Sequence, residues 1–295
     1  MAKAGLLFVG TDDGVVLYSE PGAAGRWIRI GQELRGTAIS AVWTCSDDPT
    51  IVLAATEKAL LRSTDGGALW EPIAGVAGGL LAGSKADPFV VYCLAPDGKI
   101  SRSSDAGATW MQVGLVPVAA ASVFIAAPDD KAALYAAAGA QIWSSGDSAA
   151  SWAMPGELPG VVTGLAVLPG HAGVYASAKG LLYKYDAEQW QPITNAQPVA
   201  GPLAILAGRE PTLLAALASG EIGRSSDDGA TWEGTGSEID WGTGLQALVV
   251  APYHMDIAFA GGGPSVALSV DRGRTWQRLK GDSTQVRAIA VARLV

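Results

Sequence analysis

Short apolar runs separated by turn-forming residues make up most of this chain. Residues 37–43, 51–56, 122–126 and 244–250 are examples, and each is bounded by Gly, Pro, Asp or Ser. Apolar runs of four to eight residues between such turn formers are typical of β-strands. No window has the i, i+3, i+4 apolar spacing of a long amphipathic helix. The pattern therefore predicts an all-β fold of many short strands.

Tryptophan marks a repeat in this pattern. Seven of the ten tryptophans follow one another at intervals of 43, 40, 42, 38, 42 and 44 residues. They are Trp27, Trp70, Trp110, Trp152, Trp190, Trp232 and Trp276. Four strands in each repeat of about 42 residues are the signature of a propeller blade. We predict a single domain over residues 1–295: a seven-bladed β-propeller of four-stranded antiparallel blades, each blade ending near one of these tryptophans.

An octapeptide of the pattern S-x-D-x-G-x-T-W ends at the better-preserved tryptophans. It is complete at residues 103–110, 225–232 and 269–276, lacks the threonine at 63–70 and lacks the glycine at 145–152. Its aspartates are Asp65, Asp105, Asp147, Asp227 and Asp271. Aspartate can hold a tight turn by accepting backbone N–H bonds about two residues on, and glycine supplies positive φ. We interpret these aspartates as structural, because they lack the alternating ligand spacing of a calcium loop.

The two ends of the chain have complementary patterns. Residues 6–9 read as the second strand of a blade, so the first blade lacks its innermost strand. Residues 285–292 have the pattern of that missing strand. We expect this C-terminal run to pair with the N-terminal strands and to close the ring.

Through the octapeptide, the chain resembles the Asp-box (bacterial neuraminidase repeat) propellers along its full length. That family includes sialidases, endoglucanase-like hydrolases, sortilin-type receptors and photosystem II assembly propellers. The resemblance implies the propeller fold, and for the enzymes it implies an active site on the face away from the octapeptides. Because one fold carries such different activities, function has to be argued from the site.

The face away from the octapeptides offers little catalytic chemistry in this sequence. A sialidase needs an arginine cluster for the substrate carboxylate, and only Arg35 falls clearly on this face, with Arg287 as a second candidate. Other glycosidases need two carboxylates at a set separation, but no sheltered pair stands out among the acids of this face. These acids are Asp12, Asp13, Glu33, Glu57, Asp97, Glu157, Glu221, Glu238, Asp240 and Asp282. We therefore assign no catalytic residue.

The longest linker between repeats, residues 233–244, carries a tryptophan outside the repeat. Trp241 lies beside the acids Glu238 and Asp240. An exposed indole could stack on a sugar ring while the carboxylates bind its hydroxyls. Alternatively, Trp241 fills the space between blades six and seven. Together with Arg35, these residues are the candidate ligand-binding set.

Composition narrows the choice of partner. The net charge is −8 with a pI near 4.8, which disfavours binding to nucleic acid phosphates. Arg62, Arg102 and Arg224 each precede an octapeptide serine and should project alike from three blades. Photosystem II assembly propellers, which the chain resembles, are known for a basic patch, but three separated arginines do not form one.

No cofactor or metal motif is present. Cys45 and Cys93 lie in apolar runs and read as buried thiols, while His171 and His254 fall in turns of different blades with no cysteine nearby for zinc. No apolar stretch reaches the ~18 residues of a membrane helix. The N-terminal apolar run is too short for a signal peptide, so we expect a cytoplasmic protein, with a trimmed secreted form as the alternative.

These observations favour a non-catalytic binding or scaffold propeller, monomeric, that presents a face or the mouth of its central channel to a protein or carbohydrate ligand. Two alternatives stay open. One is a glycoside hydrolase of the Asp-box class, and the other is an assembly factor for a membrane complex.

Overall fold

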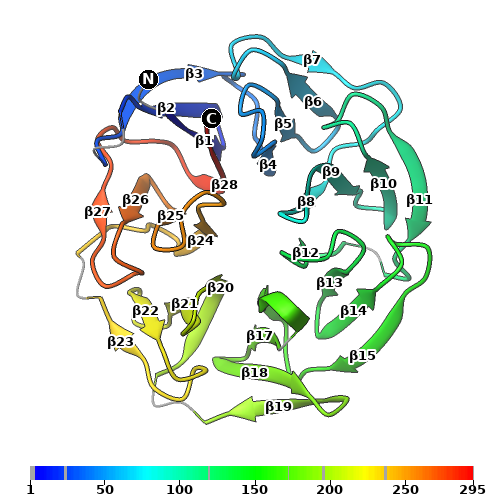
Figure 1. Cartoon of the computed structure of the whole chain (residues 1–295), viewed down its shortest axis with the longest axis vertical. Helices are drawn as coiled ribbons and strands as arrows, with labels where there is room; N and C mark the ends of the chain where they lie inside the picture. The colour runs from blue at the N-terminus through cyan, green and yellow to red at the C-terminus, as the bar shows by residue number, and fades with distance from the viewer. Residues whose placement is uncertain are drawn as a thin grey trace.

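A computed structural model describes residues 4–22, 25–118, 120–171, 173–194, 197–235 and 238–294. Within these residues the strands form seven four-stranded antiparallel sheets, arranged as blades around a central axis (Figure 1). The one helical element among them is a single 3-10 turn, η1 (Pro169–His171). In this part of the chain no helix has the length and apolarity of a transmembrane segment. The predicted all-β, seven-bladed propeller is confirmed.

Each blade runs from the axis to the rim through four strands. The innermost strands are β28 (Val286–Arg293), β4 (Ala41–Thr44), β8 (Leu80–Ser84), β12 (Val123–Ala126), β16 (Val162–Val167), β20 (Val199–Leu206) and β24 (Leu245–Val250). The second strands are β1 (Gly5–Thr11), β5 (Val52–Ala55), β9 (Asp87–Leu94), β13 (Leu134–Ala138), β17 (Val174–Ala178), β21 (Thr212–Leu217) and β25 (Ala258–Gly262).

The rim strands are the least buried strands of the blades. The third strands are β2 (Gly14–Glu20), β6 (Leu60–Ser63), β10 (Lys99–Ser103), β14 (Gln141–Ser145), β18 (Leu181–Asp186), β22 (Ile222–Ser225) and β26 (Ser265–Ser269). The rim strands are β3 (Ile28–Glu33), β7 (Glu71–Pro72), β11 (Met111–Leu115), β15 (Ala153–Glu157), β19 (Gln189–Ile193), β23 (Glu233–Gly234) and β27 (Gln277–Arg278).

The antiparallel order gives the disc two different faces. We call one the box face, because it carries the octapeptide turns between third and rim strands, along with the turns between innermost and second strands. The opposite loop face carries the turns between second and third strands and the linkers between blades.

The ring closes through its two ends, as expected from the sequence. β28 pairs antiparallel with β1, with Gly5 opposite Arg293 and Val9 opposite Ile289. Blade 1 therefore has the order β28-β1-β2-β3. Its innermost strand comes from the C-terminal end of the chain.

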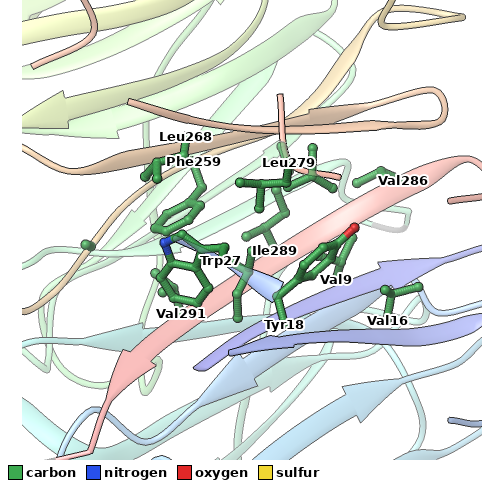
Figure 2. Packing of buried hydrophobic residues seen from close by; sticks show 14 residues of the cluster. Val9, Val16, Tyr18, Trp27, Phe259, Leu268, Leu279, Val286, Ile289 and Val291 are labelled. Atoms are coloured by element: carbon green, nitrogen blue, oxygen red, sulfur yellow. The ribbon is translucent and has the colours of Figure 1, made fainter. Parts of the chain in front are cut away.

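Tryptophan joins neighbouring blades in the core. Figure 2 shows Trp27 packed beside Phe259 of blade 7, with Tyr18 and Ile289 in the same buried cluster. The two rings meet edge to face, with centroids 5.2 Å apart at 88°, an arrangement that aromatic quadrupoles favour. Blade 1 thus keeps the packing role of its tryptophan although residues 20–27 do not follow the octapeptide pattern.

The same contact recurs around the ring, because each repeat tryptophan packs on the preceding blade. The tryptophan and a leucine of the preceding blade share a cluster in the pairs Trp70 and Leu17, Trp110 and Leu53, Trp232 and Leu182, and Trp276 and Leu214.

The octapeptide glycine meets that same leucine. A Cβ added to Gly107 would lie 2.8 Å from Leu53 Cδ2, and one added to Gly273 would lie 2.4 Å from Leu214 Cδ2. Both glycines also have positive φ, +83° and +80°, which side chains disfavour. The glycine therefore serves both the turn and the contact between blades.

Each intact octapeptide is held by one hydrogen-bond circuit. Asp227 Oδ1 accepts from the Ser225 hydroxyl at 2.8 Å and from Thr231 N at 2.9 Å, while Oδ2 accepts from the Thr231 hydroxyl at 2.6 Å. Ser225 Oγ in turn accepts from Gly229 N at 2.9 Å. The circuit recurs at Asp105, Asp147 and Asp271. The aspartate thus reaches an N–H four residues on, not two as the sequence suggested.

Two octapeptides depart from the pattern and keep most of the circuit. Asp65 accepts only backbone N–H bonds from Ala68 and Leu69, both at 3.0 Å, because Leu69 replaces the threonine. In blade 4, Ala149 stands at the glycine position, where it keeps a φ of +73° and is fully buried. The hydrogen-bond circuit, which we call the clasp, therefore depends on the serine and the aspartate more than on the glycine or the threonine.

We expect the Asp147 clasp to stabilise the fold in a pH-dependent way. Hydrogen bonds from Ser151 and Ser145 lower the pKa of Asp147 from its ordinary value to about 2. A carboxyl whose pKa is depressed on folding stabilises the native state above its unfolded pKa, about 3.9, and loses this contribution as pH falls toward the folded pKa. In urea unfolding, Asp147→Asn should lower the midpoint most at pH 7. The difference in urea midpoint between this variant and wild type should narrow between pH 4 and pH 3.

The matched control is Asp186, which is exposed at the corresponding turn of blade 5, where the octapeptide pattern is not kept. Asp186→Asn should lower the urea midpoint at pH 7 much less than Asp147→Asn does, because it removes no octapeptide circuit. A midpoint difference for Asp147→Asn that stays constant down to pH 3 would contradict the proposed role of the charge.

Candidate functional site

A hollow of about 540 Å³ lies on the loop face, at the channel end of blades 1 to 4. Its volume is within the range of small-ligand pockets. Three blade linkers, two turns and the start of β28 surround it. Its lining residues are Ala38, Ile39, Ser40, Thr56, Glu57, Gly78, Gly79, Leu80, Leu94, Ala95, Pro96, Ala120, Ala121, Ser122 and Arg287. Small and aliphatic side chains dominate this wall.

Close backbone packing shapes the hollow. A Cβ on Gly78 would lie 1.8 Å from the Thr56 carbonyl oxygen, and one on Gly79 would lie 2.1 Å from that of Leu94. Real Cβ atoms do not approach so closely, so the linker into β8 can lie against the two neighbouring turns only because both residues are glycine. The wall around it is rigid backbone rather than long side chains.

Several polar groups of the hollow bond to backbone carbonyls just outside its lining. Ser40 N donates to the Ala55 carbonyl at 2.8 Å, Ser122 N donates to that of Ala137 at 2.8 Å, and the Thr56 hydroxyl donates to that of Ala59 at 3.0 Å. A ligand therefore meets an apolar surface whose own hydrogen bonds are already made. Burial of apolar ligand atoms would be the main source of affinity.

Two opposite charges stand at the edge of this surface. The Arg287 guanidinium bonds the Asp12 carboxylate, with side chains 50% and 40% exposed. Glu57, another lining residue, is exposed. An exposed pair such as Arg287–Asp12 contributes little to stability, so Arg287 can exchange Asp12 for an anionic group of a ligand at small cost.

The structure does not bring the sequence candidates together at this hollow. Trp241 is only 5% exposed and lies in the core with Leu245 and Trp276. It fills the space between blades 6 and 7, so the interpretation as an exposed stacking surface is wrong for its indole. Its neighbours Glu238 and Asp240 are exposed, and Asp240 accepts from Gly242 N at 2.8 Å.

Arg35 also lies apart from the hollow. It is exposed on the linker between β3 and β4 and is not among the lining residues. Arg287, the second arginine considered for this face, is the one that reaches the hollow.

Two of the three arginines that precede an octapeptide, Arg62 and Arg224, act between blades. Arg62 Nε donates to the Ala106 carbonyl at 3.1 Å, and Arg224 Nε donates to that of Arg272 at 3.2 Å. Both acceptors are the residue before the glycine in the next blade's octapeptide. Arg102 instead lies over the Tyr92 ring, 5.9 Å from its centroid.

Lys184 of blade 5 makes the same kind of contact to the next blade. Its ammonium is 2.9 Å from the carboxylate of Asp228, which also stands before an octapeptide glycine. Asp228 accepts from the Tyr175 hydroxyl at 3.0 Å as well, and the Lys184 and Tyr175 hydrogen bonds lower its pKa. In Arg62, Lys184 and Arg224 the cation at this sequence position is thus a contact to the next blade rather than part of a basic patch.

Metal ligands do not gather in the described part of the chain. Across residues 4–294, apart from the gaps given above, no three His, Cys, Asp or Glu side chains converge as a metal site. Cys93 is buried, which raises the pKa of its thiol to about 12, so it is not a reactive thiolate at neutral pH.

Solved structures of other proteins share this fold at low sequence identity. YCF48 bound to D1 peptide aligns with a TM-score of 0.59 at 18% identity, covering 82% of each chain. An ancestral GH74 enzyme aligns with a TM-score of 0.66 at 13% identity, covering 93% of this chain and 44% of that one. A nidogen/laminin complex gives 0.57 at 10% identity, covering 98% of both chains. This chain thus spans less than half of the GH74 enzyme.

Sequence comparison adds no family to this picture. No protein-family model and no curated protein sequence matches the chain. The likeness to the solved structures is below 25% identity and concerns the fold alone.

Proposed function

We propose that the protein is a monomeric, non-catalytic binding propeller of the Asp-box type that receives an apolar segment of a partner protein in its loop-face hollow. The observation that carries this proposal is the 540 Å³ hollow itself, walled by aliphatic residues and rigid linkers from four blades. Arg287 supplies a cation at its edge for an acidic group beside the apolar anchor. A buried apolar anchor with polar contacts around it is a common basis of protein recognition.

The lining favours a protein segment over a glycan. Sugar sites commonly offer an aromatic ring for stacking, and the described residues that line the hollow include none. Hydrolysis by the usual glycosidase mechanism needs two carboxylates. Glu57 is the one carboxylate among those lining residues.

Two of the structural relatives support a protein partner. One is described as YCF48 bound to D1 peptide and another as a nidogen/laminin complex. Both are complexes with a peptide or protein. By analogy, a scaffold or assembly role is the more specific form of the proposal.

Blocking the hollow tests this function. Ala38→Trp places an indole at an exposed lining position, and Ser219→Trp places one on a blade 6 turn of the same face as the matched control. A phage-displayed peptide library would be selected on the wild-type protein. We expect enriched peptides with an aliphatic anchor beside Asp or Glu, bound at least tenfold more weakly by Ala38→Trp and unchanged by Ser219→Trp.

The melting temperatures of both variants would verify that they fold. Peptides that bind Ala38→Trp as tightly as wild type would refute the hollow as the site. Light scattering would check the monomeric state, and turnover of a chromogenic glycoside would overturn the non-catalytic assignment.

A further inference from the structure

The box face has a second apolar opening, where the central channel ends. Two adjoining cavities of about 400 and 250 Å³ lie there, and Lys85 and Val250 line both. Their walls come from the innermost strands of all seven blades. The aliphatic wall residues include Val42, Ile125, Leu165, Leu203, Ile205 and Val291. This opening is separate from the hollow on the loop face.

Lys85 is the cation of this opening, on the turn between β8 and β9. None of the ion pairs between described residues includes it. Nearby Lys131 and Asp87, by contrast, pair at 2.7 Å. Lys85 is solvent-accessible, yet the surrounding atoms displace enough water to lower the pKa of its ammonium. An ammonium in such a place gains more from an anionic partner than one in open water.

Several other polar side chains of the wall already make hydrogen bonds within the protein. The Ser84 hydroxyl donates to the Ala127 carbonyl at 2.6 Å, and the Thr44 hydroxyl donates to that of Ile51 at 3.1 Å. Asp129 accepts from Gly170 N. A peptide backbone inside these cavities would have to bury its amide groups against walls with few free partners, which is costly, whereas the proposed ligand of the loop-face hollow need place only an apolar side chain there. An alkyl chain has no such groups.

We propose that the box-face end of the channel binds an unbranched aliphatic monocarboxylate, with its carboxylate on the Lys85 ammonium and its alkyl chain along the apolar walls of the two cavities. The charge of Lys85 selects the head group, and the cavities select the tail. The site is independent of the loop-face hollow.

Calorimetric titration with hexanoate, octanoate and decanoate tests both halves of this site. Each added CH₂ should tighten binding about fourfold, since burial of one CH₂ contributes about 0.8 kcal/mol. Lys85→Met keeps an unbranched side chain and removes the charge, so octanoate should bind about 10- to 100-fold more weakly, as for loss of a hydrogen bond to a charged group. Octanol should bind both proteins weakly and equally.

Two further variants distinguish binding at this site from non-specific binding elsewhere on the protein. Val250→Thr puts a hydroxyl on the shared wall at nearly constant shape and should reduce the gain per CH₂. Lys58→Met, at an exposed lysine of the loop face, should change nothing. The proposal is overturned if octanoate does not bind, if Lys85→Met binds it like wild type, or if affinity is independent of chain length.

Discussion

Deletion of β28 should leave most of the chain unfolded at 25 °C. Val286, Ile289 and Val291 of this strand are buried in the cluster between blades 1 and 7. Burial of three such side chains contributes about 5–9 kcal/mol. Whole domains are stable by only about 5–15 kcal/mol, and the deletion also exposes the edge of β1. Circular dichroism and urea unfolding would measure the loss.

Restoring the strand in trans provides the control for this deletion. A synthetic peptide of residues 284–295 should bind the truncated chain and return a cooperative thermal transition. The same peptide with Ile289→Asp should not, because it would bury a carboxylate. A truncated chain that melts like the full one would refute closure by β28.

Loss of the Glu20 charge should lower the free energy of unfolding by about 3 kcal/mol, because it removes the carboxylate of a largely buried ion pair. Glu20 is 6% exposed, and its carboxylate lies 3.3 Å from the Arg293 guanidinium at the end of β28. Glu20 also accepts from Gly25 N at 2.6 Å. Arg293 lies 5.3 Å from the centroid of the Tyr253 ring in blade 7. The variant is Glu20→Gln, measured by urea unfolding.

An exposed ion pair gives the comparison for this buried one. Asp282→Asn breaks the Arg278–Asp282 pair, whose side chains are 45% and 75% exposed, and should change stability little. Glu20→Leu combined with Arg293→Met should recover part of the loss, since apolar groups can replace a buried pair. Equal effects of Glu20→Gln and Asp282→Asn would contradict a special role for the buried pair.

The fold was predictable from sequence because the repeat depends on local chemistry. The spacing of Trp70, Trp110 and the other repeat tryptophans gave the number of blades. The apolar pattern of residues 285–292 gave the closing strand. Contacts between blades were harder to predict, since they join residues about 40 positions apart. The sequence shows only that Arg62 precedes a serine. It carries no signal that Arg62 donates a hydrogen bond to the Ala106 carbonyl.

The candidate sites were less accessible to sequence reasoning. Trp241 stood out because tryptophan is rare, yet its linker folds it into the core between two blades. The loop-face hollow, in contrast, is made by inconspicuous residues such as Ala38, Gly78 and Ala121. The sequence around Lys85 does not mark it as a binding residue, because its apolar surroundings come from strands that are distant in the chain. A concave surface assembled from four or more blades leaves no motif in any one of them.

The closing strand also bears on how the chain is made in the cell. Among the described strands β1 is synthesised first, and its partner β28 follows some 280 residues later in the chain. At ribosomal speeds of about 5–20 residues per second, that interval is on the order of 15–60 s. Throughout it, one edge of β1 has no partner, and unpaired edges invite aggregation. Nascent chains of this propeller should therefore depend on chaperones until β28 has emerged.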